Sequence, residues 1–438
     1  MKAFTHSETL ALILPLLVAS TACSSEEAAA SEPTSGPEAG GSDRQRDERI
    51  ESRPQDSTDD AASLRSLGYV DVVEDEDELD EGLGPVSIYE SEAVQDGLTY
   101  FTNVKTCSSH LIDIHGTVLR SWHLEGEVWG NSILLPNGDV LAVHRDLRDE
   151  ESVDNMAASR RLLRFNWDGD VIWEHRLPVH HDVDLLPDGR FACLTYEHRI
   201  IPAIHESIPV KDHDLQLFDS EGVPGESYSL TQLLLESSET VTIQSVEPET
   251  KDGAQEVDLL HTNALEFMER PELAAQNELY APSNVMLCLR HQDLILIVDW
   301  TSKEILWSWG QGEISGPHDA TLLANGNVLL FDNGLNRKWS RIVEVDPRTD
   351  KIVWEYAADV REDFFTVTRG AAERLPNGNT LVTYSRTGTL FEVSPTGDLL
   401  WEYRNPREAD GKPRSRIVRA RRVQRVKGEA GVRFLTSD

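Results

Sequence analysis

A four-residue turn motif recurs along this chain and constrains its fold more than any other feature. The motif is Leu-Pro-Asn-Gly or a close variant, and its four copies stand at 135–138, 186–189, 323–326 and 375–378. Apolar runs flank each copy, and an Asn-Gly or Asp-Gly pair favours a tight hairpin because both positions tolerate positive φ. Each copy therefore predicts two antiparallel strands joined by a short turn.

The second half of the repeat is another hairpin, whose last strand carries a tryptophan. Trp307, Trp354 and Trp401 follow one another at a spacing of 47 residues, and Trp122 and Trp173 close earlier copies. Four strands in roughly forty to fifty residues match one blade of a β-propeller. The copies fall near 97–129, 130–179, 180–234, 258–311, 316–359 and 369–406, and the Glu-rich stretch 235–257 is interpreted as a loop between blades. The sequence thus predicts an all-β fold, a six-bladed β-propeller.

A ring of blades must be closed so that no strand edge stays open. The first copy is short of strands, and the segment 416–423 near the end of the chain alternates and is basic. We expect this segment to pair into the first blade and close the ring; the alternative is a basic surface tail. The propeller domain is predicted to cover 96–438.

The N-terminal part of the chain has the pattern of an exported protein. Lys2, an apolar run from Leu10 to Ala19 and small residues before Cys23 predict a signal peptide over 1–23. Cys23 is then either lipidated, as in a bacterial lipoprotein, or left after ordinary cleavage. The expected location is the periplasm, or a membrane to which only this N-terminal lipid would anchor the protein.

Residues 24–95 are predicted to form a disordered acidic tether. They contain 21 acidic and 5 basic residues and few aromatic ones, so they cannot bury enough apolar surface to fold. The whole chain has a formal net charge of −36, which argues against nucleic acid as a partner, because phosphate backbones require Lys and Arg. Cys107, Cys193 and Cys288 form no CxxC motif, so thiol-redox chemistry is not indicated.

Histidines stand at equivalent positions of several blades. The innermost strand of each blade lines the central channel, and counting back from the turns places His181 and His318 at the same position of two blades. His261 opens the first strand of a third blade at nearly the same register. We expect the three side chains to meet at one mouth of the channel, and we expect Asp319 to point away into its blade.

The same alignment adds polar residues at this mouth. Arg145, Arg290 and Asn333 follow second strands, and Arg369 stands near the start of the last blade. Histidines in strands are often hydrogen-bonded packing residues, but three at equivalent positions indicate a functional site. Three histidines are also a zinc ligand set; because the nearby Arg290 would repel a divalent cation, we predict no metal and no other cofactor.

Four short motifs in order along the chain carry a family resemblance. They are His180-His181-Asp182, His261-Thr262-Asn263, Leu289-Arg290 and His318-Asp319-Ala320. With the turns and the ending at 418–421, they resemble the bacterial arylsulfate sulfotransferases over about 89–423. The resemblance implies a six-bladed periplasmic propeller that moves a sulfuryl group from an aryl sulfate to a phenol without a nucleotide donor. It further implies a ping-pong reaction with a transiently sulfated histidine.

The resemblance also assigns roles to residues. His318 matches the sulfated histidine, and either His180 or His181 matches the upstream histidine of the family, with register favouring His181. His261, Asn263 and Arg290 match the remaining catalytic and sulfate-binding positions. We expect the acidic tether to replace the separate N-terminal domain of the family, which puts the family's mode of dimer formation in doubt. The alternative function is an inactive propeller that serves as an extracytoplasmic binding or assembly scaffold.

Overall fold

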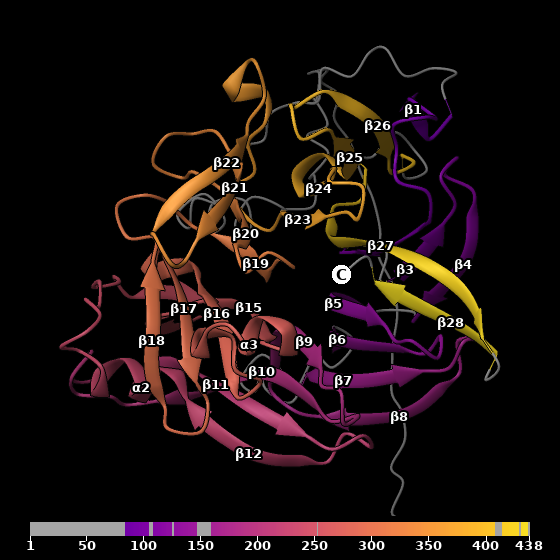
Figure 1. Ribbon diagram of the computed structural model, residues 1–438. Helices are drawn as coiled ribbons and strands as arrows, with labels where there is room; N and C mark the ends of the chain where they lie inside the picture. Colours follow the sequence, from indigo (N-terminus) through magenta and orange to yellow (C-terminus); the bar gives the residue numbers. More distant parts are fainter. Residues whose placement is uncertain are drawn as a thin grey trace, which may run out of the picture. The chain divides into compact units, whose positions relative to one another are not determined.

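The computed structural model describes residues 84–104, 108–124, 127–146, 159–251, 253–407, 414–428 and 431–436. The predicted signal peptide, Cys23, Cys107 and most of the predicted tether lie outside these residues. Within them, six antiparallel sheets of four or five strands are arranged around a central channel, as Figure 1 shows. The all-β, six-bladed propeller predicted from the repeats is confirmed.

The blades follow one another in chain order, and each runs from an inner strand to an outer one. Blade 1 contains β27 (Ile417–Gly428), β2 (Leu98–Asn103), β3 (Ser108–Ile112) and β4 (Val118–His123), with β28 (Gly431–Thr436) beside β27. Blade 2 contains β5 (Glu127–Leu134), β6 (Val140–Asp146), β7 (Arg160–Phe165) and β8 (Val171–Arg176). Blade 3 contains β9 (Val179–Leu185), β10 (Phe191–Arg199), β11 (Val210–Phe218) and β12 (Pro224–Ser229).

The second half of the ring has the same design. Blade 4 contains β15 (Thr262–Phe267), β16 (Asn284–Leu289), β17 (Leu294–Asp299) and β18 (Glu304–Trp309). Blade 5 contains β19 (His318–Leu322), β20 (Val328–Asp332), β21 (Arg341–Asp346) and β22 (Lys351–Tyr356). Blade 6 contains β23 (Ala371–Arg374), β24 (Thr380–Tyr384), β25 (Thr389–Val393) and β26 (Leu399–Arg404), with β1 (Val86–Tyr89) beside β26.

The two ends of the described chain both join the ring. β27 is antiparallel to β2, with Leu98 opposite Val423 and Phe101 opposite Ala420. β1 pairs with β26 at the outer edge of blade 6, where Tyr89 lies opposite Trp401. The predicted tether boundary at 95 is therefore too late, because an outer strand edge offers unpaired backbone groups that the alternating segment around Val86 can satisfy.

The stretch 235–257 is more than the loop expected from its composition. The helix α2 (Leu230–Glu236) begins at the cap Ser229, whose side chain accepts a hydrogen bond from the backbone N–H of Gln232. A short hairpin, β13 (Glu249–Lys251) and β14 (Ala254–Glu256), follows it. Shorter helices lie between the strands of blades 4 to 6: α3 (Pro271–Ala274), η2 (Glu278–Tyr280), η3 (Arg290–Gln292), η4 (Arg361–Asp363) and η5 (Ser385–Thr387).

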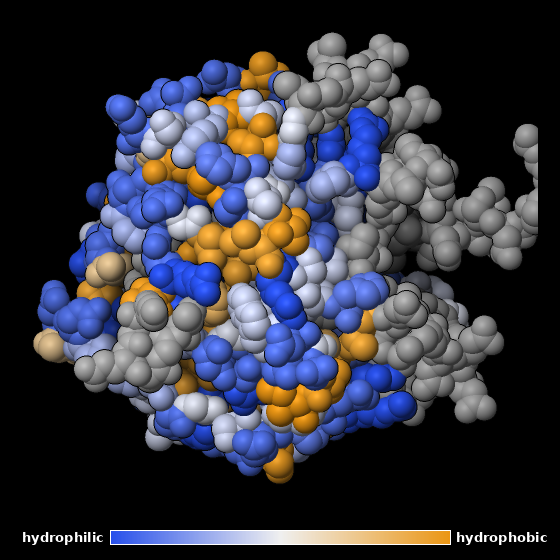
Figure 2. Space-filling model, turned by 90° about the vertical axis from the view of Figure 1, so that its right-hand side faces the viewer, coloured by the Kyte–Doolittle hydropathy of each residue, from blue (hydrophilic) through white to orange (hydrophobic). Residues whose placement is uncertain are grey.

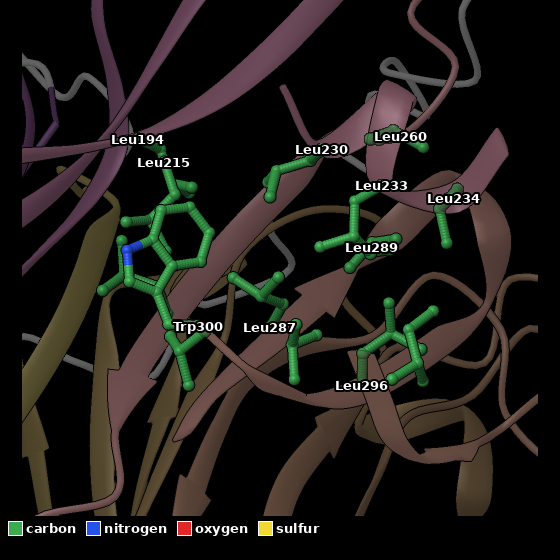
Figure 3. Close-up of a cluster of buried hydrophobic side chains, with 14 of the residues drawn as sticks. Leu194, Leu215, Leu230, Leu233, Leu234, Leu260, Leu287, Leu289, Leu296 and Trp300 are labelled. Atoms are coloured by element: carbon green, nitrogen blue, oxygen red, sulfur yellow. The ribbon is translucent and has the colours of Figure 1, made fainter. Parts of the chain in front are cut away.

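The largest hydrophobic cluster lies between blades 3 and 4. Leu230, Leu233 and Leu234 of α2 pack against strand residues such as Leu287 and Trp300, as the close-up in Figure 3 shows. Each of these side chains is at most 6% exposed. The chain between the two blades thus fills the space where their sheets diverge, and burial of this apolar surface holds the two blades together.

The repeated tryptophans connect neighbouring blades. The indole N–H of Trp307 donates to Asp350 Oδ1, that of Trp354 to the carbonyl of Pro395, and that of Trp401 to the carbonyl of Ile114. Each acceptor stands in the last turn of the next blade. Trp122 of blade 1 donates in the same way to the carbonyl of Asn166 in blade 2. Tryptophan side chains thus tie blades 1, 4, 5 and 6 to the next blade at the circumference of the ring, whereas the indole N–H of Trp173 in blade 2 has no partner among the described residues.

The surface mixes polar and apolar residues. Figure 2 shows apolar residues in separate patches among hydrophilic ones on one face. Exposed apolar side chains such as Val118, Val171 and Val353 lie on outer strands of blades. In the described part of the chain, no helix has both the length and the apolar character needed to cross a membrane. Cys193 and Cys288 are buried free thiols.

Candidate active site

The predicted site residues stand where strands begin or end at one mouth of the channel. His180, His181 and His318 lie at the starts of the inner strands β9 and β19, and His261 directly precedes β15. Arg290 follows β16. A cavity of about 230 Å³ opens at this mouth. Its lining includes these predicted residues: His180, His181, His318, Asn263, Arg145 and Arg369.

β-Bulges give the inner strands an unusual backbone at this level. The pairing shifts within β9 between residues opposite Cys193 and Leu194, and within β19 between His318 and Thr321. His181 has φ 53° and Asp319 has φ 51°. Non-glycine residues with positive φ are uncommon and cluster at functional sites. The extra residue turns Asp319 toward the channel, so the expectation that it points into its blade is wrong.

His318 is held in one tautomer. Its Nδ1 lies 2.7 Å from Asn333 Oδ1 and 3.1 Å from the carbonyl of Gly316, so Nδ1 carries the proton. Its Nε2 accepts a hydrogen bond of 3.1 Å from the backbone N–H of Arg369. Burial and then the charge of Arg290 lower the pKa of His318 to about 3. The imidazole is therefore neutral, with the lone pair on Nε2.

Asn333 was expected at the channel mouth, but it lies behind His318. Its amide is fully buried, and while Oδ1 faces His318, Nδ2 donates to the carbonyls of Thr366 and Arg369. Both polar atoms of the side chain are thus used within the protein. Asn333 orients His318 and does not line the cavity, because the end of β20 lies behind the start of β19.

A hydrogen-bonded chain runs from the cavity to a buried carboxylate. His181 Nε2 lies 3.1 Å from His261 Nε2, and His261 Nδ1 lies 2.7 Å from Asp258 Oδ2. Because the carboxylate accepts from Nδ1, the Nε2 of His261 is the acceptor for the Nε2 proton of His181. Of the two candidates left open by the sequence, His181 is the member that is hydrogen-bonded to His261.

The groups around Asp258 determine which members of this hydrogen-bonded chain are charged. Burial opposes ionisation of Asp258, but Lys211, 3.4 Å away, and His261 outweigh it, so the pKa of Asp258 lies well below its usual range. Burial lowers the pKa of His261 well below its usual value despite the adjacent carboxylate. Burial and His261 do the same for the pKa of His181. Asp258 is thus ionised beside two neutral imidazoles.

His180 and Arg290 have partners of their own. Lys211 Nζ donates to His180 Nε2 at 3.0 Å, so the proton of His180 is on Nδ1, a buried atom with no partner among the described residues. Arg290 Nη1 donates to His291 Nε2 at 2.6 Å. Arg290 is buried beneath the mouth and does not line the cavity, so it acts on His318 through its charge.

A layer of ion pairs forms the floor of the cavity. Arg419 of β27 donates to both oxygens of Asp182 at 2.8 and 3.0 Å and pairs with Asp319 at 2.6 Å. Arg421 also pairs with Asp319, at 2.9 Å. Asn131 donates to Asp182 at 2.7 Å. The closing strand therefore supplies the charges that allow two carboxylates to be buried in the channel.

The groups that sequence reasoning missed are Asp258, Lys211, Arg160 and the pair of Asp182 with Arg419. A signal for Asp258 was its position three residues before His261, but 257–261 has no equivalent in the other blades. Asp258, His261 and His291 place ligand atoms within 4.8 Å of one another, close enough for a metal ion. They do not fit one well, because Lys211 and Arg290 stand beside them and each histidine Nδ1 is hydrogen-bonded to Asp258.

Comparisons with known proteins point to one family. The family model described as arylsulfotransferase (ASST) matches residues 147–406. No curated protein sequence matches the chain significantly.

Solved structures give only distant likenesses. A protein of unknown function from Bacteroides caccae is 11% identical, with a TM-score of 0.44 over 74% of this chain and 100% of that one. A streptogramin B lyase is 11% identical, with a TM-score of 0.41 over 78% of this chain and 91% of that one. TM-scores this low carry no argument about function.

Proposed function

Because the chain belongs to the arylsulfotransferase family, we propose that it moves a sulfuryl group from a phenolic sulfate ester to a phenolic acceptor through a sulfo-histidine on His318. No nucleotide sulfate donor takes part. The observation that carries the proposal is the state of His318. Its imidazole is neutral, its Nδ1 proton is fixed by Asn333 and Gly316, and it lines a cavity at the channel mouth.

In the first half-reaction, Nε2 of His318 attacks the sulfur of the aryl sulfate. The N–S bond forms as the bond between sulfur and the aryl oxygen breaks, and the electron pair leaves with the phenolate. The hydrogen bond from the Arg369 N–H to Nε2 must first break, after which this N–H can donate to a sulfuryl oxygen. As the ring becomes cationic, its Nδ1–H bonds to Asn333 and Gly316 strengthen, and this favours the transition state.

In the second half-reaction, an acceptor phenol displaces His318 from sulfur and loses its proton. The S–N bond breaks and returns its electron pair to Nε2. His181 takes the phenol proton on Nδ1 while its Nε2 proton passes to His261, and Asp258 stabilises the imidazolium that results. A general base of this kind contributes roughly 10²- to 10⁴-fold in rate.

The test is to trap the covalent intermediate. Incubation with 4-nitrophenyl sulfate and no acceptor should add one sulfuryl group to the intact protein, and peptide mass spectrometry should place it on His318. His318→Ala should lose both the adduct and transfer to phenol while its circular dichroism stays native. His115→Ala, a change at an exposed histidine in a turn of blade 1, is the control and should keep both.

Two outcomes would contradict this proposal. If 4-nitrophenol is released only when both substrates are present and no adduct forms, transfer is direct and His318 has another role. If the purified protein neither forms the adduct nor transfers sulfate to any phenol, the alternative of a propeller that only binds partners gains support, since a fold alone does not give activity.

A further inference from the structure

Two arginines lie directly opposite each other at the end of blade 2. Arg145 of β6 and Arg160 of β7 are cross-strand partners, and both line the cavity that His318 lines. Like charges directly opposite each other destabilise a sheet. A pair of this kind at a cavity wall therefore indicates a ligand that compensates its charge.

Neither arginine has an acidic partner among the described residues. Arg160 donates to Tyr196 Oη and to the carbonyl of Val179, both at 3.2 Å. The buried Nε of Arg145 has no hydrogen-bond partner in the same part of the chain. By contrast, the cavity-lining Arg419 pairs with two aspartates. Residues 147–158, which join the two strands, lie outside the described part.

The pair stands across the channel from His318. Neighbouring inner strands follow the chain order β5, β9, β15, β19, β23 and β27, so blade 2 is separated from blade 5 by two blades on either side (Figure 1). A cavity of roughly 150 Å³ holds a benzene molecule, so about 230 Å³ leaves room for one substituted ring. A ligand that fills it contacts His318 at one end and the arginine pair at the other.

We propose that the substrates of this site are aryl sulfates and phenols that carry a second anionic group, such as a carboxylate. Arg145 and Arg160 bind that group, and the reacting oxygen lies at His318. The aryl group of the donor and the acceptor phenol occupy the same position one after the other, so one arginine pair serves both half-reactions. This inference rests on the proposed transfer function, and it names the class of substrate.

Buried acceptor atoms in the same cavity indicate that the ring also carries a hydroxyl group. Asn131 Oδ1 and Asn263 Oδ1 are buried and have no donor among the described residues. Both residues line the cavity, and their amide nitrogens are already used, toward Asp182 and Pro317. Hydroxyl groups on the ring are donors for such atoms, whereas an unsubstituted apolar ring would leave them unsatisfied.

The experiment compares two acceptors with 4-nitrophenyl sulfate as donor. The native enzyme should show a higher kcat/KM for 4-hydroxybenzoate than for phenol. Arg145→Met and Arg160→Met should each lower the ratio of the two values about tenfold, since a hydrogen bond to a charged group is worth about that factor. The control Arg190→Met removes an exposed arginine at a hairpin turn of blade 3 and should keep the native ratio.

A binding measurement separates this inference from the proposed transfer function. Calorimetric titration with 4-hydroxybenzoate should show a dissociation constant that Arg145→Met weakens about tenfold or more, whether or not turnover occurs. Binding of this kind without any sulfate transfer would support the anion site and overturn the transfer function. Equal kcat/KM for the two acceptors in the native enzyme, or an equal loss for both in the variants, would overturn the inference and leave the transfer function standing.

Discussion

At the scale of single residues, the histidines at the channel mouth differ in their hydrogen-bond partners and therefore suit different roles. His318 donates its Nδ1 proton to neutral oxygens of Asn333 and Gly316, whereas His261 donates to the ionised Asp258. A carboxylate partner stabilises an imidazolium far more than an amide does. His318 is thus suited to remain a neutral nucleophile, and His261 is suited to end a proton transfer that His181 begins.

Asp258→Asn tests this division. We expect formation of the sulfo-enzyme from 4-nitrophenyl sulfate to be little changed, because nitrophenolate needs no proton. Discharge to phenol should slow about 100-fold and should recover as the pH approaches about 10, where a phenol ionises without a base. Rapid-quench measurement of the two half-reactions over pH resolves the two rates.

A matched carboxylate provides the control for this variant. Asp212 of β11 is also buried, and it pairs with Arg199 at the end of β10, away from the histidine chain. Asp212→Asn should leave the ratio of the two half-reactions and its pH dependence at native values. If Asp258→Asn slows both half-reactions alike at every pH, its carboxylate only maintains the fold.

The register of the repeats is enough to bring His180, His181 and His318 to one mouth of the channel, because hairpin turns fix the register of the strands that they join. It predicts the wrong direction for the side chain of Asp319, since a bulge inserts one residue and reverses the alternation beyond it. The position of Asp258 could not be predicted, for another reason. It acts from an irregular segment, where no periodicity relates a side chain to the channel.

At the scale of elements, the inner strands are joined by carboxylates. Asp182 accepts from the N–H of Leu265 in the next blade, and Asp319 accepts in the same way from that of Ala372. Other acidic residues repeat the contact: Asp184 with Phe267, Glu266 with Leu322, and Glu373 with Arg422. Backbone donors of the inner strands β15, β19, β23 and β27 are thus satisfied by carboxylates of the preceding blade.

These carboxylates make Arg419 of β27 the central cation of the channel. Arg419→Met should lower the free energy of unfolding by about 3–5 kcal/mol, the usual cost of removing one member of a buried ion pair. Asp182 and Asp319 would lose a shared partner. Urea unfolding followed by tryptophan fluorescence measures the change.

A second variant separates charge from packing in this test. Adding Asp182→Asn to Arg419→Met removes one of the uncompensated anions, so the double variant should recover part of the lost stability. A loss below about 1 kcal/mol for Arg419→Met, or a double variant whose losses simply add, would show that the layer contributes little to the fold.

The blades themselves could be predicted from sequence because each one carries the repeated turn, the closing tryptophan, or both. β1 could not, since four residues inside an acidic stretch are too short for a pattern, and only the open edge of β26 determines where they pair. The hairpin of β13 and β14 could not be predicted from sequence for a similar reason. Its composition is that of a loop, and its place is set by the fold around it.

At the scale of the whole molecule, charge is distributed unevenly. The chain carries a formal net charge of −36, yet the cavity is lined by Arg145, Arg160, Arg369 and Arg419. Arginines gathered in a concave site attract an anionic substrate at short range even when the net charge repels it at long range. Added salt screens the long-range repulsion more than the local attraction.

Several buried histidines make the folded state sensitive to acid. Burial lowers the pKa of His318 to about 3 and that of His110 to about 4, and it lowers the pKa values of His180, His181, His261 and His291 as well. On unfolding, each of these imidazoles regains an ordinary pKa of about 6.5. The unfolded chain therefore binds more protons below that pH, and the free energy of unfolding must fall as the pH falls.

We expect stability to decline as the pH falls from about 6.5, well above the range in which carboxylates titrate. Burial raises the pKa of Asp184 to about 7, so protonation of this carboxyl increases the free energy of unfolding as the pH falls. This gain offsets the loss from only one of the six histidines. Urea unfolding between about pH 7 and 5 measures the slope, and each net proton contributes about 1.4 kcal/mol per pH unit. His318→Asn should reduce the slope by up to the contribution of one proton, whereas His115→Asn, a change at an exposed histidine, should leave the slope unchanged.

A free energy of unfolding that stays constant over this range would mean that the channel histidines take up protons in the folded state. The neutral nucleophile proposed for His318 would then be untenable below neutral pH.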